Sequence, residues 1–198
     1  MRRLALRFLK AKGVYVLRGP RRGPHSKYWY YLHHVWDRKD PFILIDDDVI
    51  YAADIPEILK AGLQSAPFNV CVRALDCSGD ENRLRPYKEW PIWRDCRTSR
   101  RIFATNVGGV GIHPAFALKL LYMDEAYREH CPSADDVWFH WLSLKFDMPY
   151  TQVVEGFCNP TPLPFSQRNA LSTTVNVTGN DLSIQKLYGC DEITVLCK

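Results

Sequence analysis

The sequence has no uninterrupted apolar run that approaches the roughly 20 residues of a membrane-spanning helix. Its start is basic, but it has neither a long apolar segment nor a small-residue cleavage site, so we do not expect a secretory signal peptide. The seven cysteines include no Cys-x-x-Cys pair, which argues against a zinc site. Free thiols in a reducing compartment explain an odd number of cysteines best. We therefore expect a cytoplasmic protein.

Acidic residues are absent from residues 1–36, and the first one is Asp37. The same stretch holds many basic residues, namely Arg2, Arg3, Arg7, Lys10, Lys12, Arg18, Arg21, Arg22 and Lys27. Such a block attracts anions, which include the phosphates of a small ligand, nucleic acid and the surface of an anionic membrane. A solvated basic face is the simpler alternative, and charge alone does not distinguish these interpretations.

Internal repeats and low-complexity tracts are also absent from the 198 residues. Hydrophobic residues make up 46% of the chain and charged residues 24%, as in ordinary globular proteins. A chain of this length can form one domain with a substantial core. We expect a single domain over residues 1–198, in which residues 156–198 form a C-terminal extension.

The apolar run Phe42–Ile45 is short, rich in β-branched residues and directly followed by Asp46, Asp47 and Asp48. A run of this kind predicts a buried strand. Because side chains alternate along a strand, Asp46 and Asp48 point one way and Asp47 the other. Two carboxylates on one side repel each other unless a cation lies between them, and Mg²⁺ and Mn²⁺ prefer carboxylate oxygen. A solvated acidic turn is the alternative.

The order of predicted elements favours an α/β fold. Strand Phe42–Ile45, an amphipathic helix over Ile55–Gln64 and strand Phe68–Ala74 form a βαβ pattern, which implies a parallel sheet covered by helices. Further helices are predicted over Leu4–Lys12, Lys27–Trp36, Pro114–Leu121 and Asn180–Tyr188. Further strands are predicted over Val14–Leu17, Ile102–Thr105, Tyr150–Val154 and Ile193–Leu196.

Two segments depart from this regular pattern. Residues 76–101 are polar, basic and rich in tryptophan, and a long irregular segment inside a domain is usually functional. We interpret it as a loop that faces the substrate. Gly108, Gly109 and Gly111 then follow Asn106. Glycine allows the backbone to approach a ligand closely or to adopt a positive φ.

A second acidic pair, Asp135 and Asp136, follows Ser133. Ser133 is a natural N-cap, so the two acids are expected in the first turn of a helix that continues to Phe146. Acids at this position are stabilised by the helix dipole, which is a sufficient structural reason for them. Together with Asp46 and Asp48, however, they would make a second set of carboxylates in one chain.

These segments resemble, in their order, bacterial glycosyltransferases of the GT-A fold, of the family-2-like type found in capsule and O-antigen gene clusters. The resemblance runs from about Gly23 to Asp181. It is carried by Lys27-Tyr28, Asp46-Asp47-Asp48, Arg85-Pro86-Tyr87-Lys88-Glu89-Trp90, Gly108-Gly109-Val110 and Ala134-Asp135-Asp136-Val137-Trp138. It implies a GT-A-like, Rossmann-like fold with a mostly parallel sheet flanked by helices.

The resemblance also implies roles for individual residues. Asp46 and Asp48 match the Asp-x-Asp motif that holds Mn²⁺ or Mg²⁺ against the diphosphate of a nucleotide-sugar donor. Asp47 and Lys27 fall where donor phosphate is bound. Asp136 matches the base that deprotonates the acceptor hydroxyl in inverting members, with Asp135 in support. Residues that would contact the acceptor or the sugar are Gly108, Gly109, Trp90 and Trp138.

The implied activity is transfer of a hexose from a nucleotide sugar, a UDP-sugar above all, to a glycan or lipid-linked acceptor in polysaccharide biosynthesis. The basic start of the chain would allow peripheral contact with the inner face of the membrane, and no nucleic-acid partner is implied. Family members normally open with a strand–helix–strand unit that builds the base pocket, and here Met1 falls after that unit. The exposed sheet edge would then favour self-association.

Two other functions fit the same residues. A metal-dependent phosphotransferase or nuclease could hold two metal ions with Asp46, Asp48, Asp135 and Asp136. A truncated relative could instead bind glycan or a partner without turnover.

Overall fold

The computed structural model describes residues 2–80, 83–156, 160–164 and 176–197. Five strands form its largest sheet, in the order β1-β9-β3-β10-β7. Their bounds are β1 Phe42–Leu44, β9 Val110–Ile112, β3 Val70–Cys71, β10 Tyr150–Gln152 and β7 Thr98–Ser99. The β3–β10 pair is parallel, and the other three neighbouring pairs of this sheet are antiparallel. The protein is therefore mixed α/β, and the expectation of a mostly parallel sheet is corrected.

Strand β9 is the reason for this difference. It lies between β1 and β3 and runs antiparallel to both, with Val110 opposite Leu44 and Gly111 opposite Val70. Strand β1, helix α3 (Ile55–Ser65) and β3 keep the expected order, and β1 and β3 still run in one direction. Because β9 separates them, they do not pair with each other.

Side chains of strands β1 and β3 alternate between two layers. Phe42, Leu44 and Cys71 pack into the larger hydrophobic cluster, whereas Ile43 and Val70 pack into a smaller one. The smaller cluster includes Ile55 and Leu59 of α3. This alternation is the period-two pattern expected of a strand that is covered on both faces.

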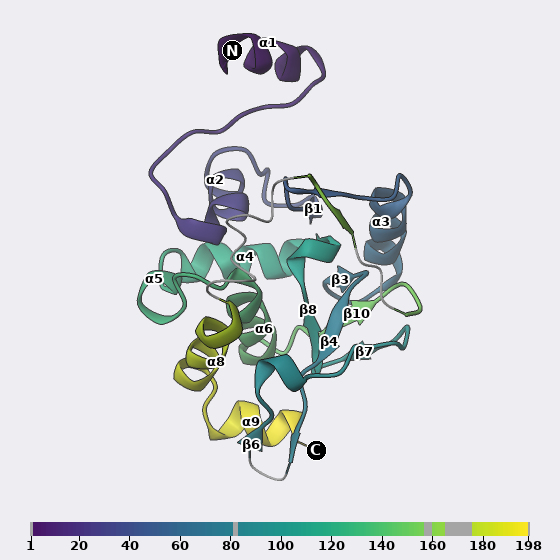
Figure 1. Cartoon of the computed structure of the whole chain (residues 1–198), viewed down its shortest axis with the longest axis vertical. Helices are drawn as coiled ribbons and strands as arrows, with labels where there is room; N and C mark the ends of the chain where they lie inside the picture. The colour runs from purple at the N-terminus through teal and green to yellow at the C-terminus, as the bar shows by residue number, and fades with distance from the viewer. Residues whose placement is uncertain (1, 81–82, 157–159, 165–175, 198) are drawn as a thin grey trace.

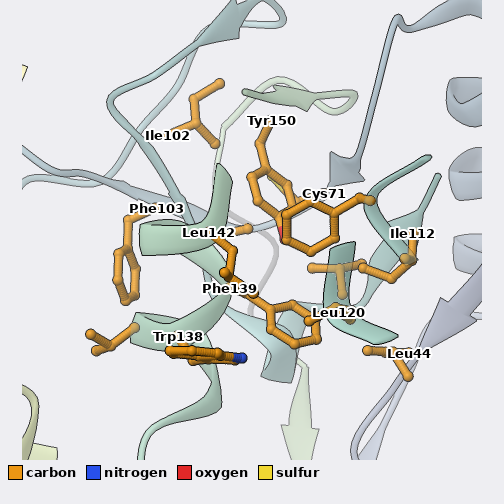
Figure 2. Close-up of a cluster of buried hydrophobic side chains, with 14 of the residues drawn as sticks. Leu44, Cys71, Ile102, Phe103, Ile112, Leu120, Trp138, Phe139, Leu142 and Tyr150 are labelled. Atoms are coloured by element: carbon orange, nitrogen blue, oxygen red, sulfur yellow. The ribbon is translucent and has the colours of Figure 1, made fainter. Parts of the chain in front are cut away.

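Helices α4 (Pro114–Met123) and α6 (Asp135–Lys145) supply much of the larger cluster, and Figure 1 shows them apart from α3, with the sheet strands between. Figure 2 shows Leu142 of α6 next to Tyr150 of the sheet, whereas Trp138 of the same helix lies on the side of Phe103. The other described α-helices are α1 Arg2–Ala11, α2 Ser26–His34, α5 Tyr127–His130, α8 Asn176–Leu187 and α9 Cys190–Leu196. Among the described helices, none is long and apolar enough to cross a membrane.

Short strand pairs and 3₁₀ turns connect these elements. The pairs are β2 Val49–Ile50 with β11 Thr161–Pro162, β4 Ala74–Asp76 with β8 Ile102–Ala104, and β5 Gly79–Asp80 with β6 Arg83–Leu84. The 3₁₀ turns are η1 Gly23–His25, η2 Tyr87–Glu89 and η3 Asn106–Gly108. Residues 76–101 thus contain several short elements and are less irregular than expected.

Two predicted strands are wrong. Val14–Leu17 is extended but pairs with no described strand, and its four side chains are between 43% and 83% exposed. Ile193–Leu196 belongs to helix α9, in which Leu196 is buried and Val195 is exposed. A bond from the Gly189 N–H to the Glu192 carboxylate closes the first turn of that helix, so local capping and burial of one face override the β-branched composition.

The start of α6 also differs from expectation. The helix begins at Asp135 with Ala134 as its N-cap residue, and no side chain caps it. Ser133 therefore does not have the predicted capping role. The consequence is that the Asp135 and Asp136 side chains make their hydrogen bonds to other parts of the molecule.

Candidate functional site

The segments predicted to be functional lie together at one edge of the large sheet, where strands β1 and β3 end and β9 begins. Asp46 follows the end of β1, Arg73 follows the end of β3, and Gly109 precedes the start of β9. Because β1 and β3 run together and β9 runs against them, all three positions lie at the same edge. Helix α6 brings its first residues, Asp135 and Asp136, to this edge through bonds to Asn106.

Lys27 joins the two acidic segments. It is the second residue of α2, and its Nζ lies 2.6 Å from Asp46 Oδ1 and 3.0 Å from Asp135 Oδ2. All three side chains are at most about a quarter exposed, so the ion pairs are poorly screened by water. The sequence placed Lys27 near donor phosphate but gave no indication that it would pair with carboxylates from both segments.

Asn106 holds the acidic pair from the other side, and sequence reasoning missed it. Its backbone N–H donates to Asp136 Oδ1 at 3.0 Å, and its Nδ2 donates to Asp135 Oδ2 at 2.8 Å. The side chain is 2% exposed, and its Oδ1 has no partner among the described residues. The available sequence signal was its position directly before the glycine segment.

The two neighbouring carboxyl groups are held in different ionisation states. Burial, together with the negative charge of Asp135, raises the pKa of Asp136 to about 7. Burial acts in the same direction on Asp135, but the Lys27 ammonium outweighs it and lowers the pKa of Asp135. Burial would lower the pKa of Lys27, but Asp135 and Asp46 outweigh it and raise that pKa. Around neutral pH the site therefore holds the Lys27 ammonium paired with Asp46 and Asp135, and one carboxyl group, Asp136, able to exchange a proton.

Asp46, Asp47 and Asp48 lie between the end of β1 and the start of β2, so the alternation expected along a strand does not apply to them. Asp46 and Asp48 are partly buried and Asp47 is exposed. The Asp46 N–H donates to the Tyr51 hydroxyl at 2.8 Å, and that hydroxyl donates to the Val107 carbonyl at 2.9 Å. This chain of bonds fixes the acidic turn to the segment that carries Asn106.

A divalent cation is compatible with this turn only with further ligands. Among the described residues, no group of three or more His, Cys, Asp or Glu side chains could hold a metal ion. Mg²⁺, however, commonly uses one or two carboxylates and takes its other ligands from water and substrate phosphates. Asp46 and Asp48 fit that donor set, with Asp46 shared between the cation and Lys27.

The glycines beside the site have structural reasons to be glycine. Gly109 has φ of +96°, which L-residues rarely adopt. A Cβ on Gly108 would lie 2.3 Å from the Cβ of Arg73. The close contact between Gly108 and Arg73 explains the first glycine and the positive φ explains the second. The predicted contact of Gly108 and Gly109 with a sugar stays a proposal.

Trp90 and Trp138 lie in the core and not on an open surface. Trp90 is 5% exposed, donates from Nε1 to the Arg85 carbonyl at 2.9 Å and packs on Phe103. Trp138 is 1% exposed and stacks on Trp141. Neither ring offers a face for a sugar, so we leave both out of the proposed site.

His25 connects two of the segments that form the site, and the sequence analysis did not identify it. It is fully buried, stacks on Tyr127, donates from Nε2 to the Cys131 carbonyl at 2.7 Å and accepts at Nδ1 from the Tyr28 hydroxyl. Burial lowers its pKa to about 4, so it is neutral at pH 7. It thereby connects the start of α2, which carries Lys27, to the chain just before α6.

The arrangement places a carboxyl group that can exchange a proton near pH 7, Asp136, beside the ion pairs that Lys27 forms with Asp46 and Asp135. Comparisons of the chain with protein-family models, with curated proteins and with solved structures find no match. The functional interpretation therefore depends on the chemistry of the site and on the motif resemblance.

Proposed function

We propose that this protein is an inverting glycosyltransferase that moves a hexose from a nucleotide-sugar donor to a hydroxyl group of a glycan or lipid-linked acceptor. The observation that carries the proposal is the Lys27 bridge. Through it, two acidic segments far apart in the sequence, at Asp46 and Asp135, become one site. A donor-phosphate region and a proton-accepting region are thereby adjacent, as a transfer reaction requires.

The donor end consists of Asp46, Asp48 and Lys27. A bound Mn²⁺ or Mg²⁺ would neutralise the charge that develops on the leaving nucleoside diphosphate. Lys27 supplies a fixed positive charge beside the same position, 2.6 Å from Asp46 Oδ1. Asp47, which is exposed, would contact the outer part of the donor.

The acceptor end consists of Asp136 and the groups that orient it. A general base works best when its pKa lies near the working pH, and the pKa of Asp136 is raised to about 7. As the acceptor oxygen forms its bond to the anomeric carbon, the bond from that carbon to the diphosphate breaks, and the acceptor proton passes to Asp136. The Asn106 N–H holds one oxygen of that carboxylate in place.

Lys27 also separates this proposal from a two-metal nuclease or phosphotransferase. Two divalent ions would need the carboxylates of both acidic segments as ligands. The ammonium group already lies between Asp46 and Asp135 and bonds to each. The geometry therefore favours one cation at Asp46 and Asp48.

The proposal is tested by measuring nucleoside diphosphate release from a panel of UDP-, GDP- and CDP-sugars with glycan acceptors. General base catalysis typically contributes about 10²- to 10⁴-fold, so Asp136→Asn should lose turnover on that scale and keep donor binding. Asp191→Asn is the matched control, because Asp191 is an exposed acid at the same helical position of α9.

Two results would contradict the proposal. Full turnover in Asp136→Asn would show that Asp136 is not the general base. Absence of turnover in the wild-type chain across the panel would favour a binding protein without catalysis. Equal loss in Asp136→Asn and Asp191→Asn would assign the effect to helix stability.

A further inference from the structure

The first residues of the chain form an arm that stands away from the rest of the molecule. We call residues 2–21 the N-terminal arm; it comprises helix α1, the extended segment 14–17 and a connection to α2. Figure 1 shows α1 separated from the other elements, joined to them by a long extended stretch. Arg22 fixes the end of the arm, since its guanidinium group lies 3.5 Å from the ring centre of Trp29 and bonds to Glu125 and Tyr127.

The arm exposes apolar side chains that the fold does not cover. Phe8 is 63% exposed and Leu9 36% exposed. In the extended segment Val14, Val16 and Leu17 are nearly half exposed, and Tyr15 is 83% exposed. Scattered apolar residues on a surface are ordinary, but this many exposed within ten residues of the chain indicate an interaction surface.

Basic side chains accompany this patch, without any acid. Arg7 and Lys10 are three residues apart and share one face of α1, whereas Phe8 and Leu9 fall on the other side. The arm as a whole contains the basic residues Arg2, Arg3, Arg7, Lys10, Lys12, Arg18 and Arg21. An amphipathic helix with a basic face is the form of helix that lies in the interface of an anionic membrane.

We propose that the N-terminal arm docks on the surface of an anionic lipid membrane. Phe8, Leu9 and the side chains of residues 14–17 enter the headgroup region, and the basic side chains face the lipid phosphates. The arm thus lies on the membrane without crossing it. This inference goes beyond the proposed transfer reaction and does not depend on it, because no residue of the arm belongs to the site at Asp46 and Asp136.

The exposed apolar residues favour lipid over nucleic acid. A nucleic acid would be bound through charge and stacking, which would leave the aliphatic side chains of Leu9, Val14, Val16 and Leu17 in water. A membrane accounts for both the apolar and the basic side chains of the arm, because apolar burial and attraction to anionic headgroups add together in interfacial binding.

The test is co-sedimentation of the full chain with vesicles. Phosphatidylcholine vesicles that contain phosphatidylglycerol should bind it, and pure phosphatidylcholine vesicles should bind it at least about tenfold more weakly. Binding should weaken as salt rises from about 0.1 M to about 1 M, because the Debye length falls from about 10 Å to about 3 Å.

Two pairs of substitutions separate the apolar and charged parts. Phe8→Ser with Leu9→Ser should weaken binding at least about tenfold through lost apolar burial. Arg7→Gln with Lys10→Gln should weaken it by a similar factor through lost charge. The controls are Tyr122→Ser, which removes a 79% exposed aromatic residue from α4, and Lys60→Gln on the surface of α3. Both controls should bind as the wild-type chain does.

Three results would overturn the proposal. The first is equal binding to charged and neutral vesicles, or to neither. The second is binding of duplex DNA or RNA that Phe8→Ser with Leu9→Ser leaves intact, while vesicles are not bound. The third is a dimer that the same apolar pair converts to a monomer without any vesicle binding, since the arm would then cover a second copy of the chain.

Discussion

Asp135 and Asp136 show how strongly a carboxyl group depends on its nearest charges. They are adjacent in one helical turn, Asp135 buried and Asp136 partly buried, yet the pKa of Asp135 is lowered and that of Asp136 is raised. Lys27 lies 3.0 Å from Asp135 and forms no direct bond with Asp136 among the described contacts. Opposite shifts within one pair are the usual way in which a protein assigns a base and its supporting charge.

The raised pKa of Asp136 predicts a stability effect with a defined sign. Between pH 4 and about 7 the folded state holds a proton that the unfolded state has released, so stability falls as pH rises through this window. Asp136→Asn cannot ionise and keeps an oxygen for the Asn106 N–H. It should match the wild-type chain near pH 4 and exceed it at pH 8, by about 4 kcal/mol.

Urea unfolding at pH 4, 6 and 8 checks this prediction. If Asp136→Asn is instead less stable than the wild-type chain at pH 8, the charge of Asp136 stabilises the helix N-terminus more than its burial costs. Asp191→Asn, at the matching exposed position, should show no gain at any of these pH values.

Asp48 is predicted to make donor binding depend on a divalent cation. Asp48→Asn removes one of the two partly buried carboxylates proposed to hold the cation, so the gain in UDP affinity on adding Mn²⁺ should fall at least about tenfold. Calorimetry with and without Mn²⁺ measures this difference, and circular dichroism checks the fold. Asp54→Asn, an exposed acid six residues later, is the control. Equal metal-dependent gains in wild type and Asp48→Asn would show that the cation is held elsewhere.

At the scale of elements, long amphipathic helices and buried apolar strands were predicted well from the sequence. Helix α3 and strand β1 differ from their expected bounds by one residue at one end. The acids of the site were also named, since charge at a strand end or helix start is visible in sequence. The partners of those acids were not, because the docking of α2 that brings Lys27 to Asp135 leaves no periodic signal.

Strand β9 was not predicted from the sequence, and its composition explains why. Val110-Gly111-Ile112 has glycine at its centre, which weakens a strand prediction. In the structure a Cβ at Gly111 would lie 2.7 Å from Val70 Cγ2 and 2.8 Å from Leu63 Cδ1. Glycine is therefore required by the close approach of α3 and β3, which only the folded chain reveals.

The same contacts predict the cost of filling that space. Gly111→Ala should destabilise the fold by roughly 1–3 kcal/mol through overpacking, because Val70 and Leu63 cannot both move away. Gly189→Ala is the control, since its added Cβ would meet only the flexible Glu192 carboxylate at 3.2 Å. Urea midpoints measure both. A neutral Gly111→Ala, or one that loses no more than Gly189→Ala, would show that α3 shifts freely over the sheet.

At the scale of the whole molecule, two buried histidines make the same pair of hydrogen bonds, one to a backbone carbonyl and one to a tyrosine hydroxyl. His140 donates from Nε2 to the Arg100 carbonyl at 2.9 Å and accepts at Nδ1 from the Tyr188 hydroxyl, as His25 does with Cys131 and Tyr28. Each ring uses both nitrogens in its neutral form. His25 connects α2 to the segment before α6, and His140 connects α6 to residues near α8, so both lie between packed elements.

These histidines predict how the whole protein responds to acid. Burial lowers the pKa of each to about 4, whereas an unfolded histidine has a pKa near 6.5. Between pH 4 and 6.5 the unfolded state therefore binds two more protons at these sites, so stability rises with pH there. Asp136 acts in the opposite direction by one proton, which leaves a net slope of stability against pH of about 1.4 kcal/mol per pH unit.

His140→Gln can keep both hydrogen bonds without titrating and should abolish most of that net slope. Urea midpoints at half-unit intervals from pH 4.5 to 6.5 would measure it, and an unchanged slope in His140→Gln would mean that His140 already carries its proton in the folded state.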